Sequence, residues 1–211
     1  MKAILILCFI LCQACGSPQQ QVSRPNGYAD MSAIWEDPTI PVCWENGNFF
    51  NAGARRQVRD AIRSSWERHS ALKFSGWSAC RTGSGGLRVL IHDGPARTLG
   101  LGRRLDGKKN GVQLNVTFRN WGKPCRSRLN HCIRMYAIHE FGHAIGLVHE
   151  HNRADRSRRC TAAPQGANGD RFLTNYDAHS VMNYCAGISE TSFKGMSAGD
   201  IRSVRAMYGR W

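Results

Sequence analysis

Hydrophobic and polar positions alternate at helical spacing near the start of the chain. Apolar or small side chains recur on one predicted helix face, at Val58, Ala61, Ile62, Ser65 and Trp66. Arginines occupy the remaining surface: Arg55, Arg56, Arg59, Arg63 and Arg68. An amphipathic helix buries its apolar face and leaves the other in water, so the arginines are most simply a solvated face. An anion-binding surface is the alternative.

Short runs rich in β-branched and aromatic residues predict the strands. They cover residues 40–44, 72–77 and 87–92, with a weaker pair at 99–104 and 112–118 around the turn 105–111. A strand, then a helix, then further strands indicate an α+β fold, in which a twisted mixed β-sheet is backed by the first helix.

Two further helices are predicted downstream. Residues 133–145 are apolar nearly all round, so this helix must be central in the domain. The segment from Ser197 to Asp200 resembles a capping box, and it precedes a last amphipathic helix that ends near Gly209.

The first 15 residues are interpreted as a signal peptide. Lys2 precedes a short apolar run at 3–11 that is too short to span a bilayer. Ala14 before Cys15 resembles a lipoprotein cleavage site with Cys15 as the lipidated residue, but Cys12 stands where such sites usually have Leu. Ordinary cleavage near Ala14 is therefore an equal alternative. The chain is predicted to be exported, and so secreted, periplasmic or lipid-anchored at the cell surface.

The remaining chain divides into a lead-in and one folded domain. Residues 16–34 are predicted to be a flexible lead-in because their first half is rich in Gln, Ser, Pro and Gly. Residues 35–211 are long enough for one core. This domain contains six cysteines, and an even number in an exported chain favours disulfides. The pairs expected from the loops they bracket are Cys43 with Cys80, Cys125 with Cys132, and Cys160 with Cys185.

The formal net charge of +14 favours association with anionic partners, including acidic proteins, wall polymers and membrane surfaces. No nucleic-acid partner is expected because no binding module accompanies the charge. Membrane attachment is expected only through a lipid anchor at Cys15. The protein is expected to be a monomer.

The stretch from His139 to His149 carries the candidate chemistry. On a helix, His139 and His143 lie one turn apart and can reach one metal ion, with Glu140 beside them. Gly146 can break the helix so that His149 turns back as a third ligand. Three neutral imidazoles suit one Zn²⁺ ion with a position open for water, which is typical of catalytic sites. An ordinary buried helix with spare histidines is the alternative.

This HExxHxxGxxH pattern resembles the zinc signature of the metzincin metalloproteases, and its continuation resembles the astacin branch. That branch typically continues HExxRxDRD, which this chain matches at Glu150, Arg153, Asp155 and Arg156 and leaves at Ser157. Residues 180–184 resemble the Met-turn of these enzymes. The resemblance implies a metzincin-like domain with a central zinc-binding helix, a Met-turn and a C-terminal helix.

The resemblance also implies roles for single residues. Glu140 would be the general base, Tyr184 would stabilise the oxyanion, and Met182 would lie under the histidines. The Glu after the third histidine, here Glu150, would contact the buried N-terminus of the mature chain, although a salt bridge to a nearby arginine is equally good. Gly146, Met182 and Glu150 are thus the expected structural supports.

The region 99–104 would be the sheet edge facing the cleft, where an extended peptide can add as a strand. Arg103 and Arg104 would favour acidic side chains in a protein or peptide substrate. Latency through a carboxylate on the zinc has only Asp30 and Asp37 to draw on, with no matching pattern around them.

Together these features predict a zinc-dependent endopeptidase. Two alternatives remain: a zinc hydrolase acting on wall peptides or other amides, and a non-catalytic basic protein that keeps zinc for structure and binds anionic surfaces.

Overall fold

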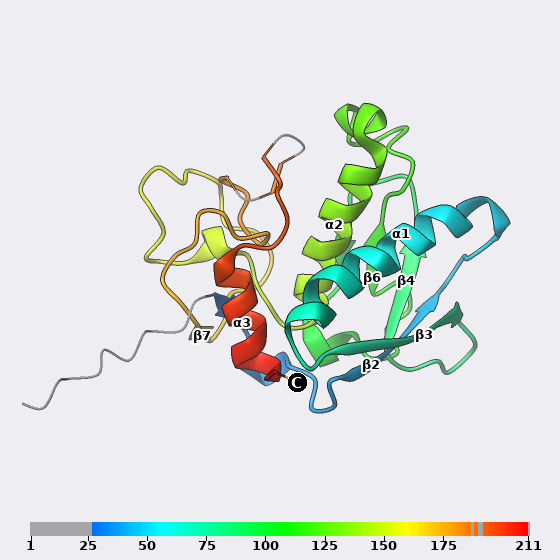
Figure 1. Cartoon of the computed structure of the whole chain (residues 1–211), viewed down its shortest axis with the longest axis horizontal. Coiled ribbons are helices and arrows are strands. Elements are labelled where there is room, and N and C mark those ends of the chain that lie inside the picture. The colour runs from blue at the N-terminus through cyan, green and yellow to red at the C-terminus, as the bar shows by residue number, and fades with distance from the viewer. Residues whose placement is uncertain (1–26, 187, 190–191, 211) are drawn as a thin grey trace, which may run out of the picture.

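The computed structural model describes residues 27–186, 188–189 and 192–210 (Figure 1). The predicted signal peptide, including Cys15, lies outside the described residues. Within them, no helix has the length and apolar character needed to cross a membrane.

A five-stranded mixed sheet is the base of the domain, as the α+β prediction required. Its strand order is β3-β2-β4-β6-β5, with β5 antiparallel to β6 and the other neighbours parallel. The strands are β2 (Thr39–Trp44), β3 (Lys73–Ala79), β4 (Leu87–Ile91), β5 (Arg97–Thr98) and β6 (Val112–Leu114).

Three α-helices accompany the sheet within the described ranges: α1 (Ala52–Ile62), α2 (Leu129–Ala144) and α3 (Ala198–Tyr208). Short 3-10 segments occur at Met31–Ala33, Phe49–Asn51, Gly102–Leu105, Lys123–Arg128 and Glu150–Asn152, and α1 continues into a π-helical turn at Arg63–Glu67. In Figure 1, α3 and the irregular chain after α2 lie to the left of α2, and the sheet lies to its right.

Helix α2 is central, as its apolar sequence predicted. The buried Trp66 indole, just beyond α1, donates to the carbonyl of Ile138 at 2.9 Å. On the sheet side, Phe141 packs against Phe74 and stacks on Trp77, with ring centroids 5.2 and 5.8 Å apart. Contacts on both sides fix the helix axis.

The predicted strand at 99–104 is wrong. The edge strand β5 is shorter and ends at Thr98, and Gly102 begins a 3-10 turn with φ of 48°. A Cβ on Gly102 would lie 1.8 Å from the carbonyl oxygen of Ala33, so the chain bends here to pass another segment. The strand predicted at 112–118 ends at Leu114, because the Asn115 side chain accepts hydrogen bonds from the next backbone amides and turns the chain.

The predicted flexible lead-in extends too far, because residues 27–34 belong to the folded domain. Strand β1 (Tyr28–Ala29) pairs antiparallel with β7 (Arg171–Phe172). The amide of Asp30 then donates to the carbonyl of Gly146 at 3.0 Å. The composition of residues 27–34 does not predict that they are folded, because their partners lie more than a hundred residues away in the sequence.

Asp30 ties this segment to the turn after β5. Its carboxylate accepts from Ser32 and lies 2.7 Å from the Arg104 guanidinium. Burial opposes ionisation of Asp30, but the hydrogen bonds of Ser32 and Arg104 outweigh it and hold the pKa below its ordinary value.

Asp30→Asn is expected to remove a pH-dependent part of the stability. A carboxyl with a lowered pKa in the folded state stabilises the fold above its unfolded pKa near 4 and loses that contribution as the pH falls. Denaturant unfolding of both proteins between neutral pH and pH 3 should show a difference of about 1 kcal/mol that shrinks on acidification. A constant difference would contradict this assignment.

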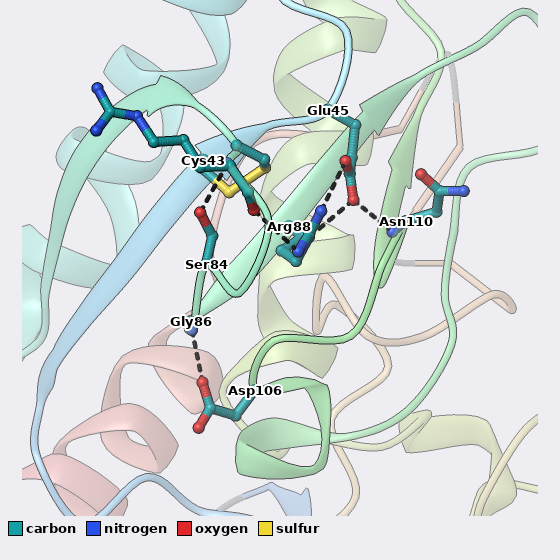
Figure 2. Close-up of a disulfide and its surroundings, with 9 residues drawn as sticks. Cys43, Glu45, Ser84, Gly86, Arg88, Asp106 and Asn110 are labelled. Atoms are coloured by element: carbon teal, nitrogen blue, oxygen red, sulfur yellow. Dashed lines mark hydrogen bonds and ion pairs between the residues drawn. A yellow bond between two sulfur atoms is a disulfide. The ribbon is translucent and has the colours of Figure 1, made fainter.

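All three predicted disulfides are confirmed: Cys43–Cys80, Cys125–Cys132 and Cys160–Cys185. Figure 2 shows the first beside a polar cluster in which Glu45 lies between Arg88 and Asn110. Glu45 pairs with the Arg88 guanidinium at 2.9 Å and accepts from the Asn110 amide at 3.0 Å. This cluster holds the turn before β6 to the sheet, next to the strand that borders the cleft.

Candidate metal centre

The structure brings together the three predicted histidines. His139 and His143 project from one face of α2, and His149 returns from beyond its end. The Nε2 atom of His149 lies 3.1 Å from that of His143 and 3.3 Å from that of His139. All three side chains are buried. Three ring nitrogens therefore converge on one point.

Each ring is oriented by a backbone carbonyl on its other nitrogen. The Nδ1 atoms of His139, His143 and His149 lie 2.7, 2.8 and 2.8 Å from the carbonyls of Val181, Leu147 and Gln165, respectively. Because a carbonyl only accepts, each Nδ1 carries the proton and each Nε2 presents a lone pair. These carbonyls could not be predicted from the sequence, since no side-chain pattern marks them.

The charge state of the rings also suits a metal. Burial, followed by the charge of His149, lowers the pKa of His139 to about 3, and burial lowers the pKa values of His143 and His149. The three imidazoles are thus neutral at physiological pH, which is the form that binds a cation. The donor set and its outer hydrogen bonds fit one zinc ion.

Two glycines shape the chain around the histidines. Gly146, as predicted, breaks the helix with φ of 103°, and its amide donates to the carbonyl of His143. Gly142 was not predicted to have a role. A Cβ there would lie 2.4 Å from the sulfur of Met182, so its hydrogen lets the Met-turn approach the helix.

Glu140 is poised beside the histidines. It is 2% exposed, and its Oε2 atom has no hydrogen-bond partner among the described residues. Burial raises its pKa to about 8, so a neighbouring cation is needed to favour the carboxylate. It lines a cleft of about 380 Å³ together with His143, His149 and Tyr184.

Tyr184 lies on the open side of the same cleft. Its hydroxyl is 3.3 Å from Nε2 of His139, and its ring stacks on those of His139 and His151. Burial, then the charge of Glu140, raises its pKa above the ordinary value, so the phenol remains a hydrogen-bond donor. His151 was not predicted to have a role, and its ring centroid lies 4.9 Å from that of Tyr184.

Glu150 is buried and binds Arg153 and the backbone of Asp177. Its carboxylate lies 3.4 Å from the Arg153 guanidinium and accepts from the amide of Asp177 at 2.9 Å. The predicted salt bridge to a nearby arginine is therefore present. The contact with a processed N-terminus stays a prediction, because residues 1–26 lie outside the described part. Asp30 and Asp37 bind Ser32, Arg104 and Thr39, away from the histidines.

Hydrogen bonds from the Met-turn to Asp200 of α3 fix its position. Asp200 accepts hydrogen bonds from the Ser180 hydroxyl at 2.6 Å, the Val181 amide at 3.0 Å and the Ser197 amide at 2.8 Å. Since the Val181 carbonyl orients His139, Asp200 in the capping box of α3 is connected to the metal centre through a single residue, Val181.

Asp200→Ala is expected to weaken both the fold and metal binding. The change leaves the Val181 and Ser197 amides without their acceptor, at a cost of about 2–4 kcal/mol of unfolding free energy. Loss of outer support lowers zinc affinity by about 10- to 100-fold. Denaturant unfolding and a competitive zinc titration measure the two effects. Asp200→Asn, which keeps the shape and one acceptor, should be milder; an unchanged zinc affinity in Asp200→Ala would refute the link.

A helix with two histidines, a glycine break, a third histidine and a methionine turn beneath them define a metzincin-type zinc peptidase domain. The family model for the Astacin peptidase family matches residues 28–171. The chain belongs to the astacin family, as the sequence resemblance indicated.

Individual relatives agree with this assignment. Zinc metalloproteinase nas-3 of Caenorhabditis elegans is 32% identical over 79 residues, which are 34% of this chain and 27% of that protein. Nematocyst expressed protein 6 of Nematostella vectensis is 32% identical over 113 residues, or 39% of each. The chain thus spans well under half the length of these curated relatives.

Solved structures share the fold. Myroilysin matches with a TM-score of 0.61 at 19% identity, covering 88% of this chain and all (100%) of that chain. High choriolytic enzyme 1, a hatching enzyme zinc-protease from Oryzias latipes, matches with a TM-score of 0.55 at 19% identity, covering 85% of this chain and 96% of that one.

Proposed function

We propose that the protein is a zinc-dependent endopeptidase. One observation carries the proposal: three imidazole lone pairs converge in an open cleft, beside a buried carboxylate oxygen with no partner among the described residues. A closed structural site would lack both the cleft and the unpaired base.

The residues divide the chemistry of peptide hydrolysis between them. Bound zinc supplies Lewis acidity, which lowers the pKa of water and polarises the scissile carbonyl. Glu140 takes a proton from the attacking water and delivers it to the leaving amine. The Tyr184 hydroxyl donates a hydrogen bond to the developing oxyanion. His139, His143 and His149 hold the metal.

The substrate is proposed to be an extended peptide lying along β5. This strand is at the edge of the sheet and lines the cleft with Ala96, Gly100 and Leu101. Gln165, Gly166 and Ala167 line the cleft as well. An edge strand offers unpaired backbone groups, so a peptide can bind there with little demand on its sequence.

Arg97 replaces the arginines that were expected to select acidic substrates. Arg103 and Arg104 contact Ser32 and the acidic residues of the N-terminal segment, and neither lines the cleft. Arg97 does line it, with its Nε held 3.0 Å from the Gln113 side chain. A cation in the wall favours an acidic side chain in the bound peptide.

Arg97→Gln is therefore expected to lower kcat/KM for acidic peptides by about fivefold and to leave neutral peptides unchanged, since an exposed charge pair contributes about 1 kcal/mol. Paired peptides that differ in one Glu or Gln would measure it. Arg103→Gln, an exposed arginine outside the cleft, is the matched control. Equal effects of both substitutions would remove the proposed preference.

The activity itself is tested by a substrate screen. Casein, gelatin and isolated wall material should be incubated with the protein, with and without chelator and with zinc restored. Cleavage of proteins that depends on zinc supports the endopeptidase. Cleavage confined to wall material supports a hydrolase for wall peptides, and absence of all cleavage supports a binding protein with structural zinc.

Export is proposed as the setting for this activity. Three disulfides within the described residues require an oxidising compartment to form and persist. The predicted leader at residues 1–15 is consistent with it.

A further inference from the structure

Two adjacent phenylalanines in the 3-10 turn just before α1 are almost fully exposed. Phe49 and Phe50 are 89% and 95% exposed, while the other exposed large apolar side chains among the described residues reach at most 46%. Their rings meet edge to face at 6.0 Å and make one apolar knob. Figure 1 shows the start of α1 at the outer edge of the molecule, well away from α3.

The backbone under this knob is well anchored. Asn48 and Asn51 form a reciprocal capping box around the two phenylalanines. The Arg55 guanidinium then binds the Asn51 side chain and the carbonyl of Asn48. The rings are thus presented to solvent by a fixed turn, and that exposure is unfavourable unless a partner covers them.

Positive charge continues from the knob along α1. Arg56, Arg59 and Arg63 recur at spacings of three and four on the exposed face, and the first turn contains no acidic residue. Two acidic side chains, Asp60 and Glu67, lie on the same side. Arg68 and Lys73 border the adjoining groove, so cations outnumber anions on this surface.

We propose that the knob of Phe49 and Phe50, together with the arginine face of α1, binds the surface of an anionic lipid membrane. Apolar rings enter the boundary between headgroups and acyl chains, while arginines beside them contact anionic headgroups. A soluble polyanion would neutralise the arginines but leave both rings in water. The combination therefore favours a bilayer over an acidic glycan.

This contact leaves the cleft accessible. No residue of α1 is among those that line the cleft, which is formed by β5, the end of α2 and the chain beyond it. Hydrolysis of a soluble peptide is therefore an independent measure of correct folding in variants of this surface. The membrane contact is separate from the lipid anchor predicted at Cys15.

Vesicle flotation measures the binding, and it should use the full chain purified without lipid. A fragment that begins at residue 27 has not been shown to fold on its own, so its failure to bind could reflect misfolding. Binding to vesicles of phosphatidylcholine with phosphatidylglycerol is compared with binding to phosphatidylcholine alone. Binding to the anionic vesicles is expected, with weakening by salt. F49S/F50S should lower the partition coefficient about tenfold or more, whereas F49W/F50W should retain it, because Trp favours membrane interfaces.

Charge is tested by a matched pair of variants. R56E/R63E should weaken binding to the anionic vesicles, whereas R158E/R159E makes the same change in net charge on an exposed loop distant from α1 in Figure 1 and should bind normally. All four variants should hydrolyse a soluble peptide like the parent chain.

Three outcomes would overturn the proposal. They are no binding to anionic vesicles, equal binding by F49S/F50S and the parent, and equal weakening by both charge variants. Binding to dextran sulfate that is unaffected by F49S/F50S, without vesicle binding, would assign the surface to a polyanion instead.

Discussion

Glu140→Gln is expected to lower kcat/KM by about 10²- to 10⁴-fold, the range that a positioned general base contributes. Gln keeps the size of the side chain but cannot take a proton from water. Since the three histidines are the residues that could hold the metal and Glu140 is not among them, zinc content should stay at that of the parent protein. Peptide hydrolysis and metal analysis of the same sample measure the two quantities.

The loss of activity in this variant separates a zinc enzyme from a protein that only binds surfaces. An endopeptidase or an amide hydrolase with this mechanism loses its activity in the variant, whereas a zinc protein that only binds surfaces keeps its function. Glu36→Gln, a highly exposed carboxylate, is the control for a change of charge alone. Full hydrolysis by Glu140→Gln with normal zinc content would show that another group activates the water.

The local parts of the site were predictable from the sequence. The spacing of His139 and His143 needs only helical geometry, and Gly146 needs only the left-handed region that glycine occupies readily. Among the disulfides, Cys125–Cys132 closes a loop with a sequence separation of only 7. Each inference concerned residues that the chain itself keeps close.

The parts that depend on distant backbone were not predictable. The carbonyls of Val181 and Gln165 orient two histidines, yet every residue type has a carbonyl and no pattern singles them out. In the sequence, Gly142 is one glycine in an apolar helix, and only the position of Met182 shows why a side chain is excluded there.

The edge of the cleft also depends on a distant segment and was predicted wrongly. Residues 99–104 were predicted as a weaker strand, but the close pass of Ala33 over Gly102 is accompanied by a 3-10 turn. Arg103 and Arg104 consequently contact the N-terminal segment, and Arg97 lines the cleft in their place. One wrong strand boundary thus changed which arginine is assigned to the substrate.

His149→Ala is expected to abolish hydrolysis by removing one of three zinc ligands while leaving the α2 helix intact. The two remaining nitrogens come from adjacent turns of one helix and cannot enclose an ion without the returning chain. Zinc binds the folded protein of the parent, so its removal by chelator should lower the parent's Tm by about 5–10 °C, as expected for about 2–3 kcal/mol of lost ligand binding.

The thermal shift distinguishes a missing ligand from a damaged fold. In His149→Ala, chelator should change the Tm little, and added zinc should restore neither stability nor activity. His179→Ala removes an exposed histidine and is the control. It should keep the fall in Tm with chelator and the recovery of stability and activity with zinc that are expected of the parent. A full zinc-dependent shift in His149→Ala would mean that the ion is held elsewhere. Because the Nδ1 atom of His149 fixes only the carbonyl of Gln165, the change should disturb that wall of the cleft and not the sheet.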